Sequence, residues 1–173
     1  MTTFVDELNT LPASEAAELL RACNGANAWV KQMVAKRPFT SGSQLLAVAD
    51  EVWSGLSTDE KREAFEHHPR IGEKLSAAAQ NDKALAFAER EQARVKLASS
   101  SAHDQMSLIN RAYEHKFGFI YIVSAAGKEG HELLDIARKR LRNDVPTEIQ
   151  IATEEQRKIT RLRLEAMIGA DAG

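Results

Sequence analysis

The sequence has little capacity for cross-links or metal sites. Cys23 is its only cysteine among 173 residues, which excludes an intrachain disulfide and a cysteine-based metal site. The five histidines show no His-x-x-x-His or Glu-x-x-His spacing of the kind that places metal ligands on one helix face. We therefore predict no metal. A single cysteine is also compatible with a reducing compartment, and we expect a cytoplasmic protein.

Long apolar runs and an excess of either charge are also missing. No run approaches the ~18 residues of a membrane span. The N-terminal residues lack the regions of a signal peptide, and the C-terminal residues do not form a peroxisomal Ser-Lys-Leu address. The net charge is −2, with dispersed basic residues, which disfavours nucleic-acid and membrane partners. Gly127-Lys128 lacks the other residues of a phosphate-binding loop, so nucleotide binding is not expected.

What is present is helical periodicity along nearly the whole chain. Apolar residues recur every three or four positions, and turn residues separate the repeats. The pattern predicts helices over about 13–24, 26–36, 82–96, 102–116, 131–142 and 147–168, with further helices starting at the caps Ser43 and Ser57. Thr147 and Gln150 have the form of a capping box for the last helix. We predict one all-α domain, residues 1–173, of seven to nine helices.

One segment departs from this pattern. Residues 117–124 are rich in aromatic and β-branched side chains, which favour a strand, but no partner strand is evident. We interpret them as a buried extended segment or a tightly packed helix start. The purely structural interpretation of residues 119–123 is that they form part of the hydrophobic core. The functional alternative is that its irregular backbone presents N–H and C=O groups to a ligand.

The segment His67-His68-Pro69-Arg70-Ile71-Gly72 is the strongest candidate for chemistry. Pro69 keeps His68 out of helical backbone, so the imidazole lies on a corner between helices. Imidazole titrates near neutral pH and suits general acid or base catalysis. A connecting histidine that only bonds a nearby carbonyl is the bland alternative. His67 could compete for the role but has no such backbone constraint.

Glu91 and Arg163 are weaker candidates taken alone. Glu91 lies in a polar stretch of a predicted helix, where most charges are solvated or paired at i, i+4. Arg163 lies four residues after Ile159, close to the apolar side of the last helix. An arginine at that edge needs an anionic or carbonyl partner, and a ligand could supply one.

Taken together, these residues resemble the 2-oxo-4-hydroxy-4-carboxy-5-ureidoimidazoline (OHCU) decarboxylases of urate breakdown. The resemblance covers most of the chain, and its markers occur in the family's order: Trp29, Arg37-Pro38-Phe39, His68 to Gly72, Glu91-Gln92, Tyr113, Phe117-Gly118-Phe119, Gly127-Lys128, Arg140 to Asn143, Lys158-Ile159 and Leu162-Arg163-Leu164. There are two departures. Ala88 stands where the family often has serine, and residues 24–27 replace a common Gly-Ser pair.

The resemblance implies a cofactor-independent carboxy-lyase, usually a homodimer, that converts OHCU to (S)-allantoin and carbon dioxide. On this carry-over His68 is the catalytic residue. The expected substrate-binding residues are Pro69, Glu91, Gln92, Phe119, Ile120, Ile122, Val123 and Arg163. The expected partner is a small-molecule substrate, with no metal and no cofactor.

Two other functions stay open from the sequence. One is a non-catalytic helical interaction domain, which would expose an apolar groove and lack a polar cleft around His68. The other is a different small-molecule lyase or hydrolase that uses the same His and Glu. The decarboxylase hypothesis, in contrast, requires His68, Glu91 and Arg163 to converge on one cleft.

Overall fold

The computed structural model describes residues 2–72, 81–95 and 97–170. These residues form helices joined by short connections, and no strand occurs in them. The helices are α1 (Phe4–Thr10), α2 (Ala13–Cys23), α3 (Asn27–Ala35), α4 (Gly42–Gly55), α5 (Thr58–Phe65), α6 (Asp82–Arg94), α7 (Ser100–Phe117), α8 (Gly130–Arg140) and α9 (Val145–Gly169). The all-α prediction is confirmed. Within the described ranges, no helix is long and apolar enough to cross a membrane.

The sequence located most helix ends because caps carry local signals. Ser57 and Glu60 form the predicted capping box of α5, and Gly118 ends α7 at φ 76°. Two predicted caps were wrong. Ser41, not Ser43, caps α4 through the Gln44 N–H. Asp144, not Thr147, caps α9, because its carboxylate accepts the Thr147 N–H.

A helix at the N-terminus was not predicted. In α1, Thr3 and Asp6 form a reciprocal capping box, and Phe4, Val5 and Leu8 are buried. The Thr-x-x-Asp spacing was the available signal. Seven residues are too few to show a clear helical period, because such a helix depends on tertiary packing for its stability.

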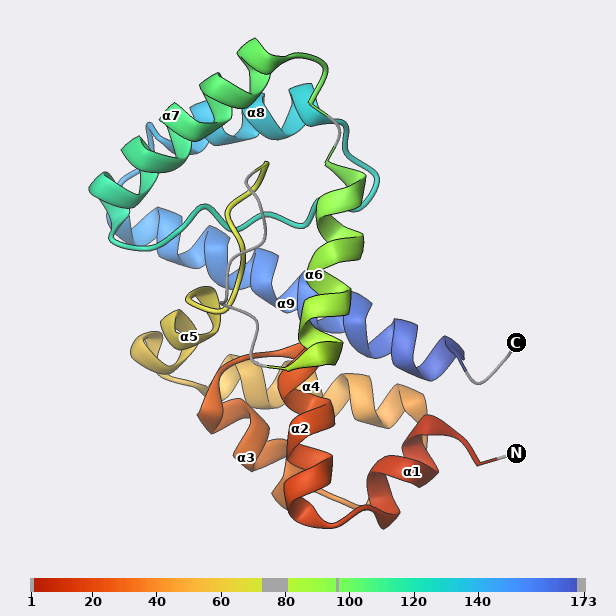
Figure 1. Cartoon of the computed structure of the whole chain (residues 1–173). Helices are drawn as coiled ribbons and strands as arrows, with labels where there is room; N and C mark the ends of the chain where they lie inside the picture. The colour runs from red at the N-terminus through yellow and green to blue at the C-terminus, as the bar shows by residue number, and fades with distance from the viewer. Residues whose placement is uncertain (1, 73–80, 96, 171–173) are drawn as a thin grey trace.

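The helices surround two hydrophobic clusters, and α9 contributes to both. The first cluster is built mainly from α1–α4 and includes Phe87 of α6 and Leu164 of α9. The second is built from α7, α8 and the segment between them, and includes Ala152 and Ile159 of α9. In Figure 1, α9 passes between the red and orange helices and the green and cyan pair α7 and α8.

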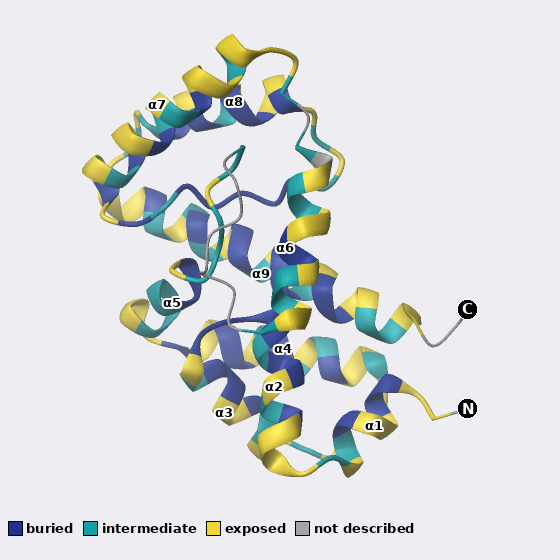
Figure 2. Ribbon diagram, in the orientation of Figure 1, coloured by how far each residue is buried: buried dark blue, intermediate teal, exposed yellow. Residues whose placement is uncertain are grey.

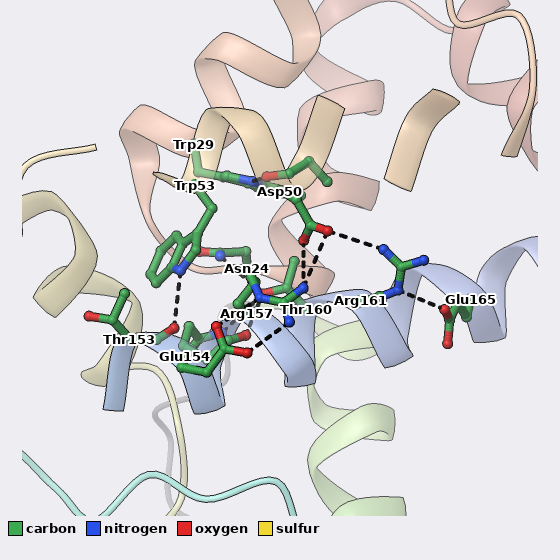
Figure 3. A network of polar contacts seen from close by, with 12 residues as sticks. Asn24, Trp29, Asp50, Trp53, Thr153, Glu154, Arg157, Thr160, Arg161 and Glu165 are labelled. Carbon is green, nitrogen blue, oxygen red and sulfur yellow. Dashed lines mark hydrogen bonds and ion pairs between the residues drawn. The ribbon is translucent and has the colours of Figure 1, made fainter. Parts of the chain in front are cut away.

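Polar contacts fix α4 on α9. The indole N–H of Trp53 donates to the Thr153 carbonyl at 3.1 Å. Asp50 accepts from Arg157 and Arg161, one helical turn apart on α9. Figure 3 shows these contacts along one side of α9. Their effect is to orient the opposite side of α9, which carries Arg163, toward α6.

The segment that joins α7 to α8 is extended and buried, as one of the two sequence interpretations held. Tyr121, Ile122 and Val123 are at most 5% exposed, and Figure 2 shows the segment mostly dark blue. Side chains replace a partner strand. The Ile122 carbonyl accepts from Arg140 at 2.6 Å, and the Ser124 N–H donates to Glu155 at 2.7 Å. These two buried backbone groups are thereby satisfied.

Arg140 is itself held by a buried carboxylate. Glu148, fully buried, accepts from Arg140 Nε at 2.5 Å and from the Asn143 side chain at 3.0 Å. The Tyr113 hydroxyl donates to the same carboxylate. The charge on Arg140 is therefore compensated where water cannot reach it.

We expect Glu148→Ala to lower the free energy of unfolding by about 3–5 kcal/mol, because it leaves Arg140 buried without its counter-charge. Urea denaturation measures this. Asp135→Ala is the control, since Asp135 pairs with Arg138 on the surface of α8, and it should change stability by less than about 0.5 kcal/mol. Equal losses would show that the buried pair is not special.

Candidate active site

A pocket lies between the two hydrophobic clusters. It is lined from four directions: by the corner after α5, by α6, by the extended segment and by α9. Its lining residues are His68, Pro69, Ile71, Phe87, Arg90, Glu91, Gln92, Tyr121, Ile122, Val123, Ser124, Ala125, Ala126, Ile159, Leu162, Arg163 and Ala166. The predicted convergence of His68, Glu91 and Arg163 on one cleft is confirmed geometrically.

The corner that carries His68 is fixed on several sides. Arg70 makes a two-pronged ion pair with Glu114 of α7, at 2.7 and 2.8 Å. The Ile71 carbonyl accepts from Asn110 of the same helix. Gly72 has φ +78° and faces Leu97, so only glycine fits there without strain.

Gly25 supports the same corner from the other side. A Cβ atom at Gly25 would lie 2.5–2.9 Å from three side-chain atoms of His67. The loop after α2 therefore packs directly against the residue before His68. The adjacent Asn24 is fully buried and bonds Thr160 of α9. The departure from the family at 24–27 is thus accommodated beneath the corner.

His68 is partly buried, and its Nε2 lies 2.6 Å from Gln156 Oε1. Burial, and after it the nearby positive charge of Arg163, lower the pKa of the imidazole to about 4, even though Glu91 and the hydrogen bond with Gln156 act in the opposite direction. The sequence predicted titration near neutral pH. The pocket instead keeps the imidazole neutral at pH 7, which suits a proton acceptor.

Arg163 and Glu91 are partners of each other. Arg163 Nε and one terminal nitrogen each donate to a Glu91 oxygen at 2.8 Å. The other terminal nitrogen donates to the Ala22 carbonyl at 3.3 Å, and the guanidinium lies over the Phe87 ring, 5.6 Å from its centre. Glu91, Ala22 and Phe87 therefore supply the partners that an arginine at the core-facing edge of α9 requires. A fork-to-fork pair also holds both groups in a fixed plane.

The remaining predicted residues divide into two groups. Pro69, Gln92, Ile122 and Val123 line the pocket, although the Gln92 amide is engaged in donating to the Arg70 carbonyl at 2.8 Å. Phe119 and Ile120 are not among the lining residues. They line a separate hollow with Arg62 and Glu114, because the extended segment reaches the pocket only from Tyr121 onward.

Sequence reasoning missed Gln156, which contacts His68 from α9. It sits in a run of charged and polar residues that resembles a solvated face. The available signal was its spacing of seven residues from Arg163, because two helical turns place both side chains on one face. It also missed Phe87 and Leu162 as lining residues.

Comparisons with known proteins identify the family of the chain. The family model for OHCU decarboxylase matches residues 9–165. The chain belongs to the OHCU decarboxylase family. A solved structure, described as OHCU decarboxylase in the presence of (S)-allantoin, superposes with a TM-score of 0.72 at 28% identity, covering 86% of this chain and 96% of that one.

Two relatives of the chain differ in how much of their own length the match covers. The chain is 31% identical over 152 residues to the Arabidopsis thaliana uric acid degradation bifunctional protein TTL, covering 88% of this chain and 47% of that protein. It is 30% identical over 137 residues to 2-oxo-4-hydroxy-4-carboxy-5-ureidoimidazoline decarboxylase of Amia calva, covering 79% and 77%. The chain thus spans less than half of the bifunctional Arabidopsis protein.

We expect His68 to make the fold less stable in acid. An unfolded histidine takes up a proton near pH 6.5, but folded His68 does so only near pH 4. As pH falls through this window the unfolded state binds more protons, so stability falls, by about 1–3 kcal/mol. Urea unfolding at pH 7 and pH 4.5 should show a smaller pH effect in His68→Asn than in the wild type. His103→Asn, on the exposed side of α7, is the control. An unchanged pH effect in His68→Asn would contradict the prediction.

Proposed function

We propose that this protein decarboxylates OHCU to (S)-allantoin, with His68 as the proton-transfer residue. The observation that carries the proposal is the meeting of His68, Glu91 and Arg163 in one pocket. Family membership and the similarity to a decarboxylase structure solved with (S)-allantoin support it. The expected partner is therefore a small-molecule substrate.

The substrate supplies its own electron sink. Its carboxylate is on a carbon that also bears a hydroxyl and adjoins a ring imine. When the carbon–carboxylate bond breaks, carbon dioxide leaves and the electron pair moves toward the imine, whose nitrogen takes up the one proton that the reaction consumes from water. The resulting enol loses its hydroxyl proton while the neighbouring carbon gains one. No separate cofactor is required by this electron balance.

His68 fits the proton transfers. It is a neutral imidazole at pH 7, so it can accept the hydroxyl proton. Its conjugate acid can return a proton to one face of the intermediate, which fixes the handedness of the product. Apolar residues such as Ile122, Val123 and Ile159 line other sides of the pocket. These residues keep solvent away, so that solvent protons compete less with the proton carried by His68.

The Glu91–Arg163 pair fits substrate recognition. The carboxylate can accept hydrogen bonds from ureido or ring N–H groups. The guanidinium has five N–H donors, of which three are directed at Glu91 and Ala22, and the others suit carboxylate or carbonyl oxygens. Because the two charges compensate each other, the pair presents both kinds of group without a net charge. Such a surface suits a substrate that is rich in amide-like groups and carries one carboxylate.

The alternative of a non-catalytic interaction domain is less well supported. It predicts a continuous exposed apolar face. Among the described residues, the large apolar side chains that are exposed are Leu108, Val145 and Leu162, which lie on different helices or 17 positions apart on α9. A different lyase or hydrolase activity is addressed by the experiment below. A single domain over 1–173, a homodimer and a cytoplasmic location stay predictions.

The direct test uses freshly generated OHCU and follows the handedness of the allantoin formed. Spontaneous decay gives a racemate, so we expect an enantiomeric excess of (S)-allantoin that increases with protein concentration. Circular dichroism of the product measures this. A racemate formed at the uncatalysed rate would refute the proposed function.

We expect His68→Asn to lower the rate of (S)-allantoin formation by about 10²–10⁴-fold, because asparagine cannot transfer a proton near pH 7. His67→Asn is the matched control and should be much milder, since His67 is not among the residues that line the pocket. Thermal melting of both variants checks that they fold. A fully active His68→Asn protein, or equal losses in both variants, would remove His68 from the mechanism.

A further inference from the structure

Gln156 contacts the proposed base but not the pocket. Its side chain is fully buried, and it is not among the residues that line the pocket. Its Oε1 lies 2.6 Å from His68 Nε2, while its Nε2 donates to Thr160 Oγ1 at 3.1 Å. An amide in this position can act on a reaction only through His68.

The orientation of the Gln156 amide follows from a chain of hydrogen bonds that begins at the backbone. The Ala26 N–H can only donate, and it donates to Asn24 Oδ1 at 3.0 Å. Asn24 must therefore present its Nδ2 to Thr160 Oγ1, at 3.1 Å; Figure 3 shows these two side chains meeting above α9. The Thr160 hydroxyl has one proton, which it donates to the backbone carbonyl of Gln156 at 3.0 Å. Thr160 can then only accept from the Gln156 side chain, which turns Oε1 toward His68.

The same logic assigns the proton on His68. An amide oxygen has no hydrogen to give, so a 2.6 Å contact requires Nε2 to be the donor. A neutral imidazole carries one proton, and with that proton on Nε2 the lone pair is on Nδ1. Asn24, Gln156 and Thr160 are at most 4% exposed. Solvent therefore does not offer substitute partners that would let the amide turn over.

We propose that Gln156 is a positioning residue that holds neutral His68 in the Nε2–H tautomer, so that Nδ1 is the nitrogen that accepts the substrate proton. The assignment of Nδ1 as the catalytic base rests on the proposed function, whereas the tautomer does not. Asn24 and Thr160 serve the same arrangement at one remove, because they fix which end of the Gln156 amide faces His68.

The tautomer is measured directly in the full-length, ¹⁵N-labelled protein at pH 7. Long-range ¹H–¹⁵N correlation distinguishes a protonated ring nitrogen from a bare one, and the spectrum of His68→Asn identifies the His68 signals. We expect a protonated Nε2 and a bare Nδ1. A protonated Nδ1, or equal averaging of the two nitrogens, would overturn the proposal whether or not the protein decarboxylates OHCU.

Two substitutions at Thr160 test the chain of hydrogen bonds. Thr160→Ser keeps the hydroxyl and should preserve the Nε2–H signal. Thr160→Val removes the acceptor for the Gln156 amide, so the His68 nitrogens should shift toward a mixture of tautomers. An unchanged tautomer in Thr160→Val would show that Thr160 does not set the amide, and a shifted tautomer in Thr160→Ser would contradict the donor assignment.

Two substitutions at Gln156 test the catalytic consequence. Gln156→Leu removes the acceptor, and we expect kcat to fall about 10- to 100-fold with KM changed much less, because the substrate-binding groups remain. Gln156→Glu keeps an acceptor for Nε2–H and adds a negative charge beside the Arg163, Glu91 and His67 charges that already act on His68. It should retain the tautomer and move the acid limb of the kcat/KM profile to higher pH.

Gln150→Leu, at an exposed position of α9, is the matched control and should leave kcat and the pH profile unchanged. A Gln156→Leu protein with wild-type kcat would overturn the catalytic assignment. An acid limb that does not move in Gln156→Glu would show that residue 156 does not act on the imidazole. If the wild type has the expected tautomer but forms no (S)-allantoin, the proposed function fails and the tautomer assignment stands.

Discussion

The pocket depends on burying an extended stretch of backbone that pairs with no strand among the described residues. Tyr121 to Ala125 is buried between helices, where each unsatisfied N–H or C=O would cost about 1–3 kcal/mol. Arg140 and Glu155 supply the missing partners at Ile122 and Ser124. The helices can therefore stay apart at this level, and the space that remains is the pocket.

This arrangement requires a charged side chain, Arg140, to be buried. Arg140 can satisfy the Ile122 carbonyl only because Glu148 neutralises it and Tyr113 and Tyr121 flank its guanidinium. The aromatic rings give van der Waals contact and a favourable face to the cation. Two markers of the family resemblance, Tyr113 and the segment Arg140 to Asn143, thus have a structural function. They support the extended segment and are not among the residues that line the pocket.

α9 links this support to the site. Along one helix, Glu148 meets Arg140, Glu155 meets the Ser124 N–H, Gln156 meets His68, and Arg163 meets Glu91. Glu148 and Glu155 are seven residues apart, as are Gln156 and Arg163, which corresponds to about two helical turns in each case. The two pairs are offset by about 100°, so all four side chains lie on one side of the helix. The other side is pinned to α4 by Trp53 and Asp50. A rotation of α9 would disturb every one of these contacts together.

The sequence by itself determined the helices with strong caps, the corner at His68-Pro69, and the candidate trio His68, Glu91 and Arg163. Helix caps and the restriction on the residue before a proline act over a few residues, so they can be recognised in the sequence alone. Only the tertiary structure decided that Glu91 and Arg163 pair with each other, that Phe119 and Ile120 face a different hollow, and that Gln156 contacts His68. These facts depend on the rotation of α9 and the path of the extended segment. Packing between residues 72 to 88 positions apart sets them, and local propensity carries no record of it.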